Sequence, residues 1–398
     1  MKTLLFVDDE PRLLQGLERQ LRGMRGEWQL LFAESGPQAL QLMAASRVDV
    51  IVTDMMMPGM DGAELLGQVM KRHPYAVRLV LSGHADQEAV LRLVGPAHQY
   101  LSKPCNAEEL RAAITRTLSI EELLSSQPLR ELVCRIPCLP SLPSLHNEIT
   151  AELRKEDASV ERVSEIISRD IAMTSKILQL VNSAFFGLPQ PASGIKDAVL
   201  YLGTATVRAL VLTLQVFSQF DGRATREFSI DELSNHCWMT GVFARRIAQA
   251  FHCGKKMDDQ CFLAGLLHDL GHLILATGLP DQYRQVLRQA RAEQRNIPEV
   301  EQENFGATHA EVGAHLLGLW GLPAPVIEAV AFHHQPAMCA SQGFSPVIAV
   351  HLADAFACTP GPAHPEPFRD QIDLRHLTAR GLASTVEAWR ELCLAEPV

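Results

Sequence analysis

Short apolar runs alternate with longer segments of helically spaced apolar residues over the first 120 residues of the chain. The apolar runs are rich in β-branched residues and predict strands at 4–7, 28–32, 48–52, 77–81 and 99–102. Helices are predicted between them, beginning at Pro11, Gly36 and Gly62, over 87–94, and after Asn106. Strands that alternate with helices indicate one parallel sheet with helices on both faces.

The pattern changes beyond residue 143, where strand signals disappear. Apolar residues then recur at helical spacing over 145–153, 160–168, 171–183, 262–275 and 374–394, which predicts an all-α bundle. Between the two parts, Pro128 is expected to break or kink a helical pattern at 119–133, and a proline-dense segment follows at 136–143. This connector either transmits a shift between the domains or acts as a passive tether.

We therefore expect domains at 1–120 and 138–340, a linker at 121–137 and a helical extension at 341–398. A chain of 398 residues is also too long for one ordinary core. The extension is expected to pack back on the bundle, and binding of a partner is the alternative.

Composition narrows the class of protein. A hydrophobic content of 47% is typical of a soluble globular protein, and a net charge of -10 argues against nucleic-acid binding, since no basic stripe or helix-turn-helix is evident. The nine cysteines form no C-x-x-C pair, which favours thiols of a reducing compartment. The first apolar run ends at Asp8 and is no signal peptide, and no apolar run reaches membrane-spanning length. We expect a cytoplasmic protein without a membrane segment.

Polar residues stand at the carboxyl ends of the predicted strands, where parallel sheets bind ligands: Asp8, Asp9, Asp54, Ser82 and Lys103. Taken alone, Asp54 could equally be a loop cap. Three carboxylates at one edge repel each other unless a cation lies between them, and Mg²⁺ suits such oxygen ligands. Mg²⁺ and Lys103 would offset the charge of a phosphoryl group, Asp54 would be its nucleophile, and the Ser82 hydroxyl could bond a phosphoryl oxygen.

The acidic pair, Asp54 with Met-Pro-Gly-Met-Asp-Gly at 57–62, Ser82, and Lys103-Pro104 resemble, in this order, a response-regulator receiver domain. The resemblance implies a flavodoxin-like α/β fold with a doubly wound, five-stranded parallel sheet. It implies Asp54 as the phosphoacceptor, Mg²⁺ bound by Asp9, Asp54 and the Met56 carbonyl with support from Asp8, and a switch pair of Ser82 and Tyr100. It also implies a cis peptide at Lys103-Pro104.

The same resemblance implies partners. A sensor histidine kinase would supply the phosphoryl group, and a homodimer would form through the fourth helix, the fifth strand and the fifth helix. A receiver-like domain that is not phosphorylated is the alternative.

Nine of the fifteen histidines lie between His236 and His351. His268-Asp269 lies in the predicted helix at 262–275, where His272 shares the face of His268. His309 begins a helix with a capping box, His333-His334 ends one that begins near Pro325, and Asp354 lies in one opened by Ser345-Pro346. Imidazoles and carboxylates from several helices can form a transition-metal site, whereas a single buried histidine is more often a hydrogen-bonded core residue.

This spacing resembles the HD superfamily of metal-dependent phosphohydrolases, and more closely the HDOD domain, the HD-related output domain. The resemblance rests on Leu-Pro-Ser-Leu-Pro at 139–143 and on the segments 180–187, 195–203 and 266–271. It implies an all-α HD-type fold with a ligand set for Fe, Mn or Zn that consists of His236, His268, Asp269, His309, His333, His334 and Asp354.

The chain departs from the cyclic-di-GMP phosphodiesterases of the HD-GYP type. They carry a lysine three residues after the HD aspartate, where this chain has His272, and Gly-Tyr-Pro where Gly313 is followed here by Ala314-His315. HDOD domains are generally regarded as regulatory outputs. Two functions therefore stay open: a response regulator whose HDOD domain acts on a downstream protein, and a cyclic-dinucleotide phosphodiesterase gated by the receiver.

Overall fold

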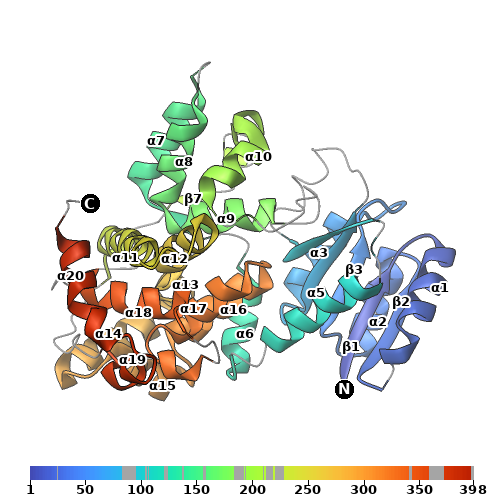
Figure 1. The fold of residues 1–398 in the computed structure, drawn as a ribbon. Helices are drawn as coiled ribbons and strands as arrows, with labels where there is room; N and C mark the ends of the chain where they lie inside the picture. The colour runs from blue at the N-terminus through green and yellow to red at the C-terminus, as the bar shows by residue number, and fades with distance from the viewer. Residues whose placement is uncertain are drawn as a thin grey trace.

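The computed structural model describes every residue of the chain except 25, 83–95, 104, 106, 121–123, 137–138, 156–157, 183–191, 193, 209, 212–217, 220–227, 340–342, 358–371 and 396–398. The N-terminal part is an α/β domain around a five-stranded parallel sheet with the strand order β2-β1-β3-β4-β5 (Figure 1). Its strands are β1 (Lys2–Val7), β2 (Trp28–Ala33), β3 (Val50–Asp54), β4 (Val77–Ser82) and β5 (Gln99–Ser102). Its described helices are α1 (Pro11–Gln20), α2 (Gly36–Ala45), α3 (Gly62–Arg72) and α5 (Ala107–Ile120), and η1 (Arg22–Met24) follows α1.

All five strands lie where the hydrophobic pattern predicts them, so the predicted fold class is confirmed for this domain. The helix predicted at 87–94 lies outside the described residues, as do Pro104 and Asn106. Side chains alternate between the two sheet faces: Leu4 and Phe6 of β1 pack on the side of α1 and α5, whereas Leu5 and Val7 pack on the side of α2 and α3. Both faces are therefore buried, as expected for a parallel sheet.

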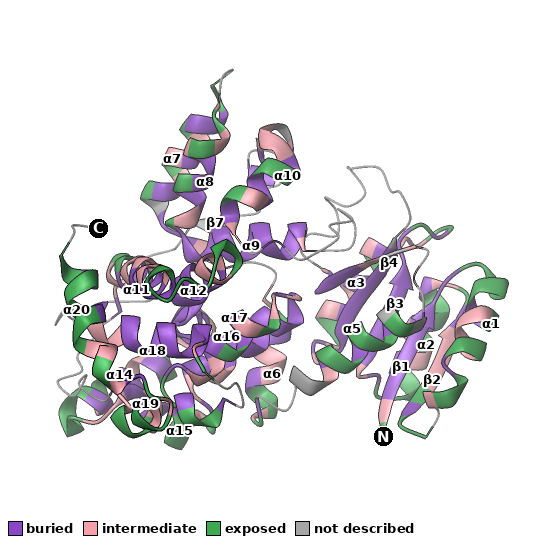
Figure 2. Ribbon diagram, in the orientation of Figure 1, coloured by how far each residue is buried: buried purple, intermediate pink, exposed green. Residues whose placement is uncertain are grey.

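The C-terminal part is almost entirely helical, as predicted. Its helices up to residue 357 are α7 (Pro143–Leu153), α8 (Val160–Ser168), α9 (Ile171–Val181), α10 (Ile195–Arg208), α11 (Ile230–Ala250), α12 (Lys255–Leu267), α13 (Leu270–Gly278), α14 (Pro280–Glu293), α15 (Ile297–Phe305), α16 (His309–Leu319), α17 (Ala324–Phe332) and α18 (Pro346–Ala357), with η6 (Pro336–Met338) after α17. Every residue of α9 is buried, which marks it as a central helix (Figure 2). One detail differs from prediction, because short strands β6 (Pro140–Ser141) and β7 (Ser218–Gln219) pair in parallel.

The C-terminal extension packs back on the bundle, as predicted. The predicted extension at 341–398 begins with α18, which is a helix of the bundle itself. The part beyond α18 contains α19 (Leu374–Ala379), η7 (Ala383–Thr385) and α20 (Val386–Leu394). Trp389 and Cys393 of α20 are buried, and Arg246 of α11 donates to the Cys393 carbonyl at 2.9 Å. The aromatic ring of Trp389 also contacts Phe251 at the end of α11.

The single helix predicted over 262–275 is instead two helices, because the chain turns at His268 and Asp269. In an unbroken helix, consecutive side chains point about 100° apart. The turn allows both side chains to face the interior of the bundle, where both are buried.

One apolar stretch among the described residues, Lys255–Gly278, is long enough and apolar enough to span a membrane, so the prediction that none reaches this length is wrong. The stretch comprises α12 and α13, and 89% of its apolar window is buried within the protein. Helices at the centre of a helical domain have the same composition.

The connector between the two parts contains α6 (Gln127–Cys134), which is hydrogen-bonded to the sheet through Arg78. Pro128 lies in the first turn of α6, so it begins a new helix rather than kinking a long one. The Arg78 side chain of β4 is fully buried and donates to the carbonyl of Cys134 at 2.7 Å. The same guanidinium donates to the Pro96 carbonyl at 2.5 Å and lies 2.9 Å from the His98 ring. The apolar core on the α1 and α5 face of the sheet continues through α6 into the helical part.

Candidate functional site

The first polar cluster lies at the carboxyl edge of the sheet. Val7 of β1 is in register with Thr53 of β3, so Asp8 and Asp54 follow at the same level. Lys103, directly after β5, places its Nζ 2.6 Å from Asp54 Oδ1 and 2.8 Å from Asp8 Oδ2. Both carboxylates are buried, and the ammonium joins them.

Backbone groups complete the hydrogen bonding of the two carboxylates. Asp8 Oδ1 accepts from the Glu10 N–H at 2.9 Å, and Asp54 Oδ2 accepts from the Met56 N–H at 3.2 Å. Burial acts to lower the pKa of Lys103, but its hydrogen bonds to Asp54 and Asp8 outweigh burial and raise the pKa above the ordinary value. The ammonium therefore stays charged and balances two carboxylates.

The other predicted residues of this cluster lie around it. Asp9 is exposed next to Asp8, and Met56 is exposed in the loop after β3. Ser82 ends β4 in register with Ser102, although its side chain is outside the described part of the structure. Tyr100 of β5 is buried on the α2 and α3 side of the sheet, and burial raises its pKa.

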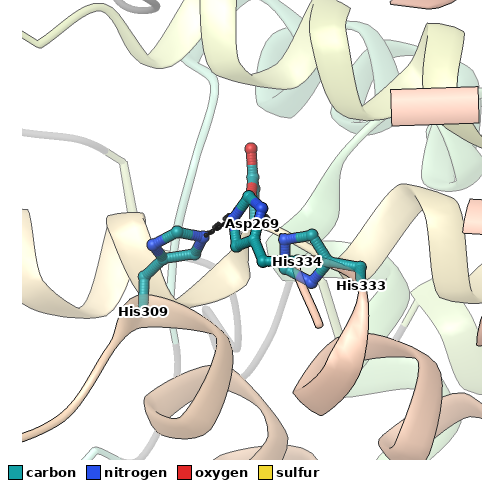
Figure 3. Close-up of side chains that lie close together, drawn as sticks. All are labelled: Asp269, His309, His333 and His334. Atoms are coloured by element: carbon teal, nitrogen blue, oxygen red, sulfur yellow. Dashed lines mark hydrogen bonds and ion pairs between the residues drawn. The ribbon is translucent and has the colours of Figure 1, made fainter. Parts of the chain in front are cut away.

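The second cluster lies inside the helical domain, where the seven predicted metal-ligand side chains converge. They come from α11, the turn between α12 and α13, the start of α16, the end of α17, and α18: His236, His268, Asp269, His309, His333, His334 and Asp354. Figure 3 shows four of these side chains, Asp269, His309, His333 and His334, gathered around one point.

Asp269 lies between two groups of ligand atoms. Its Oδ2 is 3.3 Å from His268 Nε2 and 3.7 Å from His236 Nε2. Its Oδ1 is 3.4 Å from His309 Nε2 and 3.7 Å from His333 Nε2. One carboxylate that faces imidazoles on both sides has the geometry of a ligand bridging two cations.

Outward hydrogen bonds fix the orientation of the imidazoles. His268 and His333 each bond through Nδ1 to the carbonyl three residues earlier, at 2.7 and 2.8 Å. His309 Nδ1 lies 2.7 Å from Glu301 Oε2. A proton on Nδ1 leaves the Nε2 lone pair of each ring directed at the centre of the cluster, as in metal-binding histidines.

The inward nitrogens are the part of the cluster that fits a metal. The buried Nε2 of His333 has no hydrogen-bond partner among the described residues. His334 Nε2 lies 3.0 Å from His309 Nε2, and His236 Nε2 lies 3.2 Å from His268 Nε2. Two ring nitrogens so close need a proton or a cation to relieve the repulsion of their lone pairs. A mixed set of imidazole nitrogens and carboxylate oxygens suits transition-metal ions such as Fe, Mn or Zn.

The electrostatics of the cluster also favour positive charge at its centre. Burial lowers the pKa of His309, but Glu301 and Asp269 outweigh burial and raise it to about 10. Burial raises the pKa of Asp269, but His268 outweighs burial and holds that pKa well below the ordinary range. Burial, assisted by His268, lowers the pKa of His333 to about 3, so this ring is neutral and able to donate its lone pair.

Comparisons with protein families match both parts of the chain. A response regulator receiver domain model matches residues 4–115, and an HDOD domain model matches residues 139–336. The chain belongs to the response regulators that carry a receiver domain followed by an HDOD domain.

Relatives of this receiver–HDOD protein include an uncharacterized protein of Treponema pallidum (strain Nichols), which is 30% identical over 64% of this chain and 47% of its own length. A cyclic di-GMP phosphodiesterase of Thermotoga maritima is 32% identical over 29% of this chain and 31% of its own length. The chain thus spans less than half of each of these relatives. Among solved structures, the MmoQ response regulator of Methylococcus capsulatus str. Bath is 25% identical, covering 65% of this chain and 94% of its own, with a TM-score of 0.50.

The HDOD domain holds two further residues that the sequence did not single out, Glu301 and Tyr283. Glu301 is fully buried and accepts from the backbone N–H of His309 at 2.7 Å and from Tyr283 Oη at 3.2 Å. In the sequence, only the spacing of His268 and His272 pointed to the surroundings of Glu301 and Tyr283. Glu301 itself lies on α15 between exposed glutamates, so its sequence context is typical of a solvated helix face.

His272, where the HD-GYP enzymes carry lysine, belongs to this outer layer of the HDOD cluster. Its Nδ1 bonds to Tyr283 Oη, and its ring stacks on His309 with a centroid distance of 3.7 Å. Its Nε2 lies 3.8 Å from Asp269 Oδ1. The imidazole therefore supports the ligand cluster from inside the protein and does not extend into solvent as a free ammonium would.

Proposed function

We propose that this response regulator is switched by phosphorylation of Asp54, with a sensor histidine kinase as the phosphoryl donor and the HDOD domain as the regulatory output on a downstream protein. The observation that carries the proposal is the contact of Lys103 with both Asp54 and Asp8 at the end of β5. Such a fixed ammonium suits phosphoryl transfer, which depends on positioning and charge compensation.

The roles follow from the chemistry of the side chains. An Asp54 carboxylate oxygen would attack phosphorus, and Lys103 would balance the charge of the acyl phosphate that forms. Asp8, Asp9, Asp54 and the Met56 carbonyl would hold Mg²⁺, which neutralises charge on the transferred group. Ser82 would donate to a phosphoryl oxygen, and Tyr100, the other member of the switch pair, would change its position in response. We place this reaction in the cytoplasm, which fits the lack of disulfides among the described cysteines.

Phosphorylation by acetyl phosphate and Mg²⁺ tests this proposal. We expect the intact mass to rise by one phosphoryl group and peptide mapping to place it on Asp54. Asp54→Asn should abolish the modification. Asp61→Asn is the matched control, because asparagine can replace aspartate as the N-cap of α3. An unchanged mass, or a label on another residue, would refute the proposal.

A second candidate function is a metal-dependent phosphohydrolase in the HDOD domain. The inward lone pair of His333 and the position of Asp269 between two imidazole groups favour it. The likeness to a cyclic di-GMP phosphodiesterase covers 29% of this chain, which is less than the length of the HDOD domain.

Metal analysis of the full-length protein, combined with a cyclic-dinucleotide hydrolysis assay, separates the two functions. Two metal ions per chain with turnover that His236→Ala abolishes would establish the enzyme. His252→Asn is the control, since His252 is exposed with a positive φ of 55° that asparagine tolerates. An output that survives His236→Ala, without turnover, would establish the regulatory role.

A further inference from the structure

Strand β5 lies at the edge of the receiver sheet and contacts the HDOD domain through Gln99. The buried Gln99 side chain donates from Nε2 to the carbonyls of Leu319 at 3.0 Å and Gly318 at 3.3 Å. These carbonyls belong to the last turn of α16, where the helix cannot supply the usual backbone donors. The Gly318 carbonyl also accepts from the Gly321 N–H at 3.0 Å. A receiver side chain therefore caps an HDOD helix.

The contact is reciprocal. Gln179 of the HDOD helix α9 is buried and donates from Nε2 to the carbonyl of His98, the residue before β5, at 3.2 Å. Lys176 donates to Gln179 Oε1 at 2.8 Å and holds this amide in orientation. Each domain thus recognises the backbone of the other through one glutamine.

Local geometry makes room for Gln99. Gly321, just beyond α16, has a φ of +73°, and a Cβ on this residue would lie 3.3 Å from Gln99 Cδ. On the receiver side, Thr117 Oγ1 of α5 lies 3.4 Å from Gln99 Nε2. The amide is held between the two domains, and a shift of β5 by a few tenths of an ångström would weaken its bonds.

Helix α16 joins this contact to the histidine cluster. Its first residue, His309, is held by Glu301 and lies within the Thr308–Glu311 capping box, and all but one of its 11 residues are buried. At the other end of the path, Lys103 follows β5 directly and contacts Asp54. Asp54, β5, Gln99, α16 and His309 therefore form a continuous chain of contacts.

We propose that the Gln99–α16 contact carries the phosphorylation state of Asp54 to the HDOD domain. A phosphoryl group on Asp54 draws Lys103 toward it, shifts β5, and releases Gln99 from the α16 carbonyls. Polar contacts between domains of one chain are reversible, which suits a switch. The inference rests on the proposed function of Asp54.

Hydrogen–deuterium exchange of the full chain tests the inference, with and without acetyl phosphate and Mg²⁺ and with the intact mass followed in parallel. We expect phosphorylation to increase exchange of the α16 amides about fivefold, the effect of losing about one net hydrogen bond. Gln99→Met, which keeps the side-chain volume but removes the donors, should show this increase without a phosphoryl donor. Gln29→Met, an exposed glutamine on β2, is the matched control.

Each outcome decides a separate claim. Phosphorylated Asp54 with unchanged exchange in α16 overturns the inference and leaves the phosphoacceptor in place. Exchange in Gln99→Met that equals that of Gln29→Met also overturns it, whatever happens at Asp54. An unmodified Asp54 refutes the proposed function and with it the phosphorylation dependence. Circular dichroism of both variants establishes that they are folded.

Discussion

Glu301 holds His309 from two directions, because its Oε2 accepts from both the backbone N–H and Nδ1 of His309, each at 2.7 Å. The backbone bond fixes the start of α16, and the side-chain bond fixes the orientation of the ring. A fully buried carboxylate that fixes a ring in this way is typical of the residues that support metal-binding histidines.

Glu301→Gln should therefore weaken metal binding by the HDOD domain by about 10- to 100-fold, since the amide places a donor where His309 needs an acceptor. Competition with a chelator measures the change. Glu299→Gln, at an exposed position of the same helix, is expected to bind metal like the parent protein. Equal affinities for the two variants would show that Glu301 does not support the cluster.

Lys103→Met should destabilise the receiver in the absence of divalent cations, because Asp8 and Asp54 then face each other without a counter-charge. We expect a loss of about 1–3 kcal/mol in the free energy of unfolding, and recovery of part of it with Mg²⁺. Thermal unfolding with and without MgCl₂ measures both effects. Lys71→Met on the exposed face of α3 is the control, and an equal response of the two variants would contradict the prediction.

Gly271→Ala should disrupt the HDOD cluster by separating α13 from α16, because a Cβ on Gly271 would overlap the carbonyl of His309. We expect a loss of at least about 2 kcal/mol in the free energy of unfolding. Gly16→Ala in α1 meets no atom within 4 Å and should gain about 0.5–1 kcal/mol. Urea unfolding of both variants makes the comparison, and a neutral Gly271→Ala would disprove this close approach of the helices.

Asp170 predicts a pH dependence of stability. It is the buried N-cap of α9, and burial raises its pKa to about 6, although the N–H groups of Met173 and Leu142 favour the charged form. A raised carboxyl pKa stabilises the folded state below about pH 4, and this contribution is lost as the pH rises through about 6.

Asp170→Asn should remove the pH-dependent contribution of this carboxyl to the free energy of unfolding. A shift of about two pKa units limits that contribution to about 3 kcal/mol. The free energy of unfolding, measured in urea from pH 4 to 7, should fall with rising pH less steeply in this variant than in the parent. Asp61→Asn at the partly exposed N-cap of α3 serves as the control. A parent and an Asp170→Asn variant with parallel pH profiles would rule out a titrating Asp170.

The receiver was predictable because its signals are local. Each strand is a short apolar run between turn residues, and polar residues at the strand ends must meet at one sheet edge, as Asp8, Asp54 and Lys103 do. The seven HDOD residues were found through their chemical type and spacing. The sequence did not predict that these residues group on either side of Asp269, because this grouping depends on the turn at His268 and Asp269.

The contacts between domains could not be predicted. Gln99 and Gln179 are ordinary polar residues in the sequence, and their role depends on which backbone carbonyls lie opposite them after folding. Arg78 reads as a solvent-facing charge within β4 but is fully buried. Long-range packing, rather than local periodicity, decides all three positions.

Burial of Arg78 limits where the modules of this chain can be separated. The guanidinium donates to the Cys134 carbonyl at the end of α6, and α6 also packs against α16 of the HDOD domain, so α6 contacts both modules. A receiver that ends at residue 120 lacks α6, so the Arg78 guanidinium would lose its bond to the Cys134 carbonyl and become exposed to water. A joint placed before Gln127 should therefore destabilise the exchanged receiver, whereas a joint placed after Cys134 keeps the bond between Arg78 and α6.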